Sequence, residues 1–188
     1  DLLHISSNQI KFQNTHIGFL DDWYEQFRWL IRLGERYSNL KICLKGREGD
    51  GLRDNKEFMN LIENSNLKFI DKLSDGDDSE YKFQSLNSYD IAMAAKVVCT
   101  WQSTMGFELI GHGKPCLFLD PGGRNIAHLP NDSFHEQIKV KTYEEFEKEF
   151  FLIQNKKSKF YNLKQEDYCI RSDSTHKEIF EILRNSVI

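Results

Sequence analysis

The chain has 188 residues, of which 25 are Lys or Arg and 29 are Asp or Glu, and its formal net charge at pH 7 is -4. This length allows one domain with a sizeable hydrophobic core. The basic residues are scattered rather than gathered in a stripe, which argues against a broad nucleic-acid-binding surface but permits a small phosphate ligand.

Hydropathy and cysteine spacing indicate the compartment. No apolar run approaches the roughly 20 residues of a membrane span, and no signal peptide is recognisable in the sequence. The cysteines lack C-x-x-C spacing, and three of them lie in apolar, strand-like runs. We therefore expect a cytoplasmic protein with buried, free thiols rather than disulfides or a metal site. The cysteines are Cys43, Cys99, Cys116 and Cys169.

The first half of the chain predicts alternating helices and strands. Residues 1–18 alternate loosely between apolar and polar, and we expect them to lead in from a preceding domain. Residues 21–37 place apolar side chains at helical spacing, with Asp22 and Glu25 as a capping-box-like start. The further predicted elements are a strand at 41–44, a helix at 55–64, a strand at 67–70 and a short helix at 86–95.

A corner rich in glycine and basic residues follows the predicted strand at 41–44. It contains Lys45, Gly46 and Arg47, and it lies where a parallel sheet presents the carboxyl end of a strand. Lys45 or Arg47 could contact a phosphate there, because a cation forms strong charge-assisted hydrogen bonds with phosphate oxygens. A solvated surface turn is the equal alternative.

The stretch 97–125 organises the rest of the chain. A buried strand is predicted at 97–100, and Ser103 and Thr104 then mark the start of a helix. Amides of the first helical turn form a site of partial positive charge where an anion can bind. Gly106 lowers helix propensity in this turn, so its missing side chain indicates close approach by a ligand or another backbone. Glu108 lies one turn further along the same helix face as Thr104.

The second half of this stretch predicts a helix stop, a strand and a glycine corner. Gly113 and Pro115 end the helix, and 116–119 is the next buried strand. The corner contains Gly122 and Gly123, which let the backbone approach a ligand. Arg124 and Asn125 are the candidates there for holding a donor sugar or a carboxylate, with a structural glycine turn as the alternative.

These elements predict an α/β fold: a Rossmann-like, three-layer domain with a parallel sheet that binds its ligand at the carboxyl ends of the strands. We expect this domain to occupy 19–170. A last strand at 136–140 and a helix at 143–154 belong to it, and a helix within 171–188 is expected to pack back.

The pattern Ser103-Thr104-x-Gly106-x-Glu108, followed by Gly113-Lys114-Pro115 and an apolar strand, resembles the donor-binding half of GT-B glycosyltransferases and of the related sugar-nucleotide 2-epimerases. In these families the Ser/Gly turn holds the phosphate of the donor and the Glu takes the ribose hydroxyls. The resemblance therefore implies phosphate contacts for Ser103 and Thr104 and a ribose contact for Glu108. Ser88 and Tyr89, at the start of the preceding helix, are further candidates for contact with base or phosphate, with helix capping and packing as the alternative.

The resemblance implies the nucleotide-sugar-binding half of a GT-B glycosyltransferase that builds a bacterial surface polysaccharide, with a CMP-Kdo-type donor as one option. The expected partners are the donor, a glycan acceptor and an N-terminal GT-B domain, through which peripheral contact with the inner face of the membrane is possible. We expect neither cofactor nor metal, since Asp75 and Asp77 have the spacing of a metal motif but lie in a loose acidic loop. The catalytic base is expected on the N-terminal domain. Asp120 and His128 are weak candidates near the reacting centre.

Two alternatives remain open at this point. A 2-epimerase or glycerophosphotransferase would use the same scaffold, although the epimerases usually show paired glutamates at the ribose position, where this chain has Phe107 before Glu108. A non-catalytic nucleotide- or partner-binding domain would keep the scaffold for structure alone.

Overall fold

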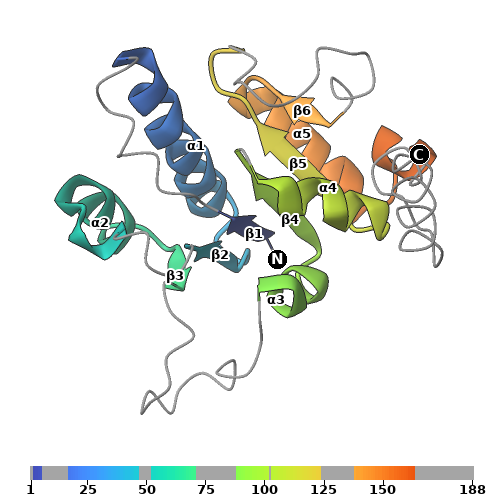
Figure 1. Ribbon diagram of the computed structural model, residues 1–188, viewed down its shortest axis with the longest axis horizontal. Helices are drawn as coiled ribbons and strands as arrows, with labels where there is room; N and C mark the ends of the chain where they lie inside the picture. Colours follow the sequence, from blue (N-terminus) through green and yellow to red (C-terminus); the bar gives the residue numbers. More distant parts are fainter. Residues whose placement is uncertain are drawn as a thin grey trace, which may run out of the picture.

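A single parallel sheet lies at the centre of the computed structural model, which describes residues 2–5, 17–46, 52–70, 88–101, 103–123 and 138–163. Six strands follow one another in the order β3-β2-β1-β4-β5-β6, from lower left to upper right in Figure 1. All neighbouring strands are parallel. The strands are β1 (Leu2–Ile5), β2 (Ile42–Lys45), β3 (Lys68–Ile70), β4 (Val97–Thr100), β5 (Cys116–Leu119) and β6 (Lys139–Val140).

Helices cover both faces of this sheet. They are α1 (Ile17–Arg36), α2 (Lys56–Glu63), α3 (Ser88–Ala94), α4 (Thr104–Gly111) and α5 (Tyr143–Gln154), with short 3-10 helices η2 (Leu52–Asp54) and η4 (Lys159–Asn162). One buried cluster joins α1, α2 and α5 to the sheet, and a second joins α3 and α4 to it. The strand order and the two helical layers are those of a doubly wound, Rossmann-like α/β fold.

The central strands β4 and β5 are buried on both faces because their side chains alternate between the two clusters. Leu117 and Leu119 of β5 belong to the cluster of α1, whereas Cys116 and Phe118 belong to that of α4. Successive side chains of a strand point to opposite faces, so a strand between two helical layers must be apolar throughout. This is why β5 reads as a continuous apolar run in the sequence.

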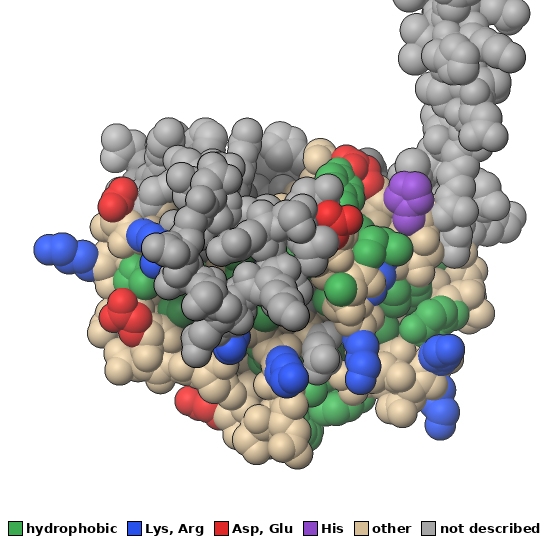
Figure 2. Space-filling view, turned by 90° about the horizontal axis from the view of Figure 1, so that it is seen from below, with side chains coloured by type: hydrophobic (Ala, Val, Ile, Leu, Met, Phe, Trp, Pro, Cys, Tyr) green, Lys and Arg blue, Asp and Glu red, His purple; other side chains and the backbone are tan. Residues whose placement is uncertain are grey.

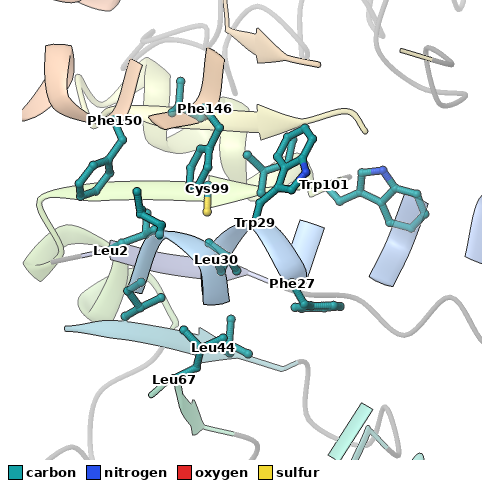
Figure 3. Close-up of a cluster of buried hydrophobic side chains, with 14 of the residues drawn as sticks. Leu2, Phe27, Trp29, Leu30, Leu44, Leu67, Cys99, Trp101, Phe146 and Phe150 are labelled. Atoms are coloured by element: carbon teal, nitrogen blue, oxygen red, sulfur yellow. The ribbon is translucent and has the colours of Figure 1, made fainter. Parts of the chain in front are cut away.

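Aromatic side chains fill much of the space between the sheet and α1. Trp23, Phe27 and Phe58 have no exposed surface, and the ring centroids of Phe27 and Phe58 lie 5.1 Å apart. Figure 3 shows the side chains of α1 meeting those of the central strands and of α5. The aromatic stripe that the sequence places at helical spacing is therefore core.

Strand β1 differs from the sequence-based prediction. Residues 1–18 were expected to lead in from another domain, but Leu2–Ile5 pairs with both β2 and β4 and so lies in the middle of the sheet. Four residues are too few to show a clear period, and only their pairing with distant strands reveals their position. Helix α1 also begins earlier than predicted, at Ile17, so that Asp22 is a buried residue inside the helix and not part of a capping box.

The last strand, predicted at 136–140, is described only as the two residues Lys139–Val140. The other predicted elements among the described residues agree with the structure within one or two residues at their ends. The strands at 97–100 and 116–119 and the helix at 143–154 have the predicted bounds, and Asn55 caps α2 as its N-cap residue. The structure confirms the α/β class and the parallel sheet. The helix expected within 171–188 lies outside the described residues.

Candidate functional site

The strand order reverses between β1 and β4, and this reversal marks the candidate site. The chain leaves β1 toward the helical layer of α1, and it leaves β4 toward the layer of α4. In open α/β sheets the connections diverge at such a point and leave a crevice outside the carboxyl ends of the strands, where ligands bind. Helix α4 begins at Thr104, shortly after β4 ends at Thr100, so its N-terminus lies at this edge of the sheet.

Other predicted site residues reach the same edge. The register places Lys45 of β2 and Thr100 of β4 opposite the same residue of β1, Ile5. Two strand spacings of about 4.8 Å therefore separate the backbones of Lys45 and Thr100, which gives about 10 Å. A ligand of nucleotide size spans such a distance.

The first turn of α4 is partly accessible to solvent: Thr104 is exposed, whereas Met105 and Gly106 are buried. Ser103 is the N-cap residue, with extended backbone and a half-buried side chain, and Thr104 is exposed. The Ser103 hydroxyl makes no capping hydrogen bond, contrary to what its position in the sequence suggests, although its carbonyl oxygen accepts from the Gly106 amide at 2.9 Å. The earlier amides of the turn have no acceptor inside an α-helix. Together with the helix dipole they favour an anion at this position.

Gly106 has a packing role that the sequence did not reveal. A Cβ atom at this position would lie 2.6 Å from Cζ of Phe118 and 3.1 Å from Cγ2 of Thr100. The missing side chain therefore lets α4 lie close to β4 and β5. The approaching group is a neighbouring side chain, whereas the sequence pattern was interpreted as room for a ligand or a backbone.

Glu108 is half-buried on α4, and its carboxylate accepts a hydrogen bond from the hydroxyl of Tyr89 at the start of α3. This hydrogen bond, followed by partial burial and the negative charge of Glu108, raises the pKa of Tyr89 above its ordinary value. The Tyr89 ring remains 43% exposed. The sequence singled out both residues but gave no sign that they are in contact.

The first two residues of the Gly-Lys-Pro segment, Gly113 and Lys114, have structural roles. Gly113 has a φ of 74°, and the amides of Gly113 and Lys114 donate to Ile110 and Leu109, which closes α4 with a Schellman motif. The ammonium of Lys114 donates to the carbonyl oxygens of Met93, at 2.8 Å, and of Ala95. Lys114 thus satisfies carbonyl groups at the C-terminal end of α3, and partial burial lowers its pKa.

Lys45 is only 5% exposed and its ammonium donates to the carbonyl oxygen of Gly46. It is therefore a buried cation at the carboxyl end of β2, not part of a solvated turn. Arg47, the other basic candidate of this corner, lies outside the described residues.

The glycine corner after β5 is a type II turn. The amide of Gly123 donates to the carbonyl oxygen of Asp120 at 3.0 Å, Pro121 occupies the second position, and Gly122 has a φ of 83°. Gly123 also has a positive φ, of 62°. Both glycines are exposed, whereas the side chain of Asp120 is buried. The predicted binding residues Arg124 and Asn125 and the catalytic candidate His128 lie outside the described residues.

Charge, metal and membrane features add little to this site. Figure 2 shows both basic and acidic side chains distributed over the face that it draws. Among the residues that the structure describes, no three His, Cys, Asp or Glu side chains are grouped so that they could hold a metal ion. Within the same part of the chain, no helix is long and apolar enough to cross a membrane.

Fold and site together define the class: a doubly wound α/β protein with a helix N-terminus at the reversal of its strand order. Comparisons of the chain with protein-family models, with curated proteins and with solved structures find no match.

Proposed function

We propose that this chain is the nucleotide-sugar-binding half of a metal-independent GT-B glycosyltransferase, acting in the synthesis of a bacterial surface polysaccharide, with a CMP-Kdo-type donor as one option. The observation that carries the proposal is the place of the α4 N-terminus at the switch point between β1 and β4. A diphosphate or monophosphate bound there would meet the amides at the start of the helix and the hydroxyls of Ser103 and Thr104. Glu108 lies one helical turn further on, at the distance of an attached ribose.

The chemistry follows from this placement. An acceptor hydroxyl attacks the anomeric carbon of the donor, the bond between that carbon and the phosphate oxygen breaks, and the nucleotide leaves with the electron pair. Negative charge therefore grows on the phosphate during the reaction. The helix dipole, the amides and the hydroxyls of Ser103 and Thr104 would stabilise that charge at the start of α4. The general base that takes the acceptor proton is proposed to lie on the N-terminal domain.

Isothermal titration with CMP, CDP, UDP and GDP, each with EDTA and again with Mg²⁺, tests the proposal. We expect one nucleotide, CMP for a Kdo-type donor, to bind measurably tighter than the others, with the same affinity in both buffers. An affinity that appears only with Mg²⁺ would contradict the metal-independent mechanism. Binding by none of the four would favour a non-catalytic domain instead.

A substitution separates a ribose contact from general effects of charge. Glu108→Ala should weaken the binding of the preferred nucleotide about 10- to 100-fold, because a hydrogen bond to a charged group contributes about 1.5–3 kcal/mol. Glu63→Ala removes an exposed carboxylate at the end of α2, in the other helical layer, and should leave the affinity unchanged. Equal nucleotide affinities of the Glu108→Ala and Glu63→Ala variants would show that Glu108 does not contact the nucleotide.

A further inference from the structure

One contact of the candidate site joins two helices that are separate in the sequence. The hydroxyl of Tyr89, in the first turn of α3, donates to Oε2 of Glu108 on α4. The Tyr89 ring is 43% exposed and the Glu108 side chain is half-buried, so the pair lies at the surface and not in the core. A tyrosine needed only for packing would not have to present its hydroxyl to this carboxylate.

The contact restricts a side chain that is otherwise mobile. A free glutamate side chain loses conformational entropy when it is fixed in one position. An ionised carboxylate offers about four acceptor positions, so one hydrogen bond from Tyr89 leaves others for a ligand. Because the tyrosine fixes the carboxylate before the ligand arrives, binding of the ligand no longer bears this entropy cost.

The helix that carries Tyr89 is itself held in place. Ile91 and Ala92 of α3 are buried in the same cluster as Leu109 and Ile110 of α4. At the other end of α3, the ammonium of Lys114 donates to two backbone carbonyl oxygens of the chain leaving the helix. Tyr89 is thus presented to Glu108 from a helix that is fixed along its length.

We propose that Tyr89 is a positioning residue of the nucleotide site, whose hydroxyl orients the Glu108 carboxylate so that it accepts hydrogen bonds from the vicinal hydroxyls of a ribonucleotide. This inference rests on the proposed function, because it requires a nucleotide at the start of α4. Beyond the proposed function, the inference states that the site selects ribose over 2′-deoxyribose. It assigns this selection to Tyr89 and Glu108 together rather than to Glu108 alone.

The test measures the affinity for a ribonucleotide and for its 2′-deoxy form in the wild-type chain and in variants. The probes are CMP, CDP, UDP and GDP with their 2′-deoxy counterparts, and the pair whose ribonucleotide binds tightest is carried forward. Tyr89→Phe keeps the ring and removes the hydroxyl. We expect it to weaken ribonucleotide binding about 3- to 10-fold, as the loss of one hydrogen bond predicts, and to weaken 2′-deoxynucleotide binding less, because that ligand keeps only the 3′-hydroxyl of the pair. The ratio of the two affinities should therefore fall.

Two further variants complete the test. In the Glu108→Gln background, adding Tyr89→Phe should cause little additional loss, since the hydroxyl acts through the carboxylate. Tyr161→Phe is the matched control: Tyr161 lies in η4, is 44% exposed, and its hydroxyl donates to the carbonyl oxygen of Ile153 in α5 at 3.0 Å. It should change neither affinity. The ratio of affinities is independent of the folded fraction, so a loss of stability cannot imitate the expected result.

The outcomes distinguish the inference from the proposed function. An unchanged ratio in Tyr89→Phe, together with weaker binding by Glu108→Gln, overturns the positioning role and leaves the nucleotide site intact. Normal ribonucleotide binding by Glu108→Gln would show that Glu108 does not contact the ribose, and the positioning role of Tyr89 would then be overturned as well. Binding of no nucleotide by the wild-type chain overturns both proposals.

Discussion

Replacing Gly106 with alanine tests whether packing or ligand access accounts for the glycine in the first turn of α4. The added Cβ would lie 2.6 Å from Cζ of Phe118, whereas ordinary van der Waals contact begins at 3.4 Å. Phe118 is 1% exposed, and its ring packs against Phe107 with 4.7 Å between the centroids. The ring has little room to retreat, so α4 itself must shift away from the sheet.

The expected cost follows from two opposing terms. Inserting a methyl group into a packed core costs about 1–3 kcal/mol. Alanine is up to about 1 kcal/mol better than glycine inside a helix, which offsets part of that cost. We therefore expect Gly106→Ala to lower the free energy of unfolding by about 1–2 kcal/mol, which corresponds to a fall in melting temperature of roughly 2–8 °C for a chain of this length.

Urea unfolding followed by circular dichroism measures the effect, and Gly34→Ala is the matched control. A Cβ at Gly34, inside α1, would lie 2.5 Å from Oδ1 of Asn66, the end of an exposed side chain that can rotate away. This variant should be as stable as the wild type or slightly more stable. Adding Phe118→Leu to Gly106→Ala should cost less than the two single changes predict, because the smaller side chain makes room for the methyl group.

The result that would refute this reasoning is a Gly106→Ala variant with wild-type stability. The close approach of α4 to β5 would then not be what demands a glycine. If the same variant also lost nucleotide binding, the original interpretation of Gly106 as room for a ligand would be supported instead.

Three further predictions concern the helix caps, the thiols and one tyrosine. Thr142→Ala should cost about 1 kcal/mol in urea unfolding, because the Thr142 hydroxyl accepts from the Glu145 amide at 3.2 Å. Ser103→Ala removes no capping hydrogen bond, so its free energy of unfolding should stay within about 0.5 kcal/mol of the wild type, while nucleotide binding weakens. Equal losses of stability in Thr142→Ala and Ser103→Ala would contradict the cap assignments. Burial raises the pKa of the Cys99 and Cys116 thiols, so neither should react with a thiol reagent until the protein unfolds, and rapid labelling of either of these two cysteines in the native chain would exclude its burial. Burial, followed by the hydrogen bond to Glu147, raises the pKa of Tyr143 from 10.0 to about 12. The stability that this shift provides is complete below about pH 10 and is lost as the pH rises toward about 12, and Tyr143→Phe should abolish that loss in unfolding measured from pH 9 to pH 12.

Patterns local to the chain could be predicted wherever one physical preference dominates. The apolar run 116–119 and the helical spacing in 143–154 gave β5 and α5 with their observed bounds. Gly113 before Pro115 ended α4 at the right place, since few other residues adopt a positive φ at a helix end. The parallel sheet could also be predicted from the sequence, because strands that alternate with helices along a chain are compatible with few other topologies.

Contacts between distant segments could not be predicted in this way. Strand β1 has four residues and no distinctive period, and its place in the sheet comes from pairing with β2 and β4. The role of Gly106 depends on a ring in the next strand, and the hydroxyl of Tyr89 meets Glu108 because α3 and α4 join the same buried cluster.

The sequence alone determined the kinds of element, most of their bounds and the start of a helix shortly after the strand at 97–100. Hydrophobic period, helix caps and turn residues act over a few positions, and a single chain displays them directly. Only the tertiary structure decided that this helix start lies at the reversal of the strand order and that Lys45 is buried at the carboxyl end of β2. It also decided that the Glu108 carboxylate accepts a hydrogen bond from Tyr89. Such features depend on which segments meet in space, and that is fixed by the packing of the whole sheet and its two helical layers.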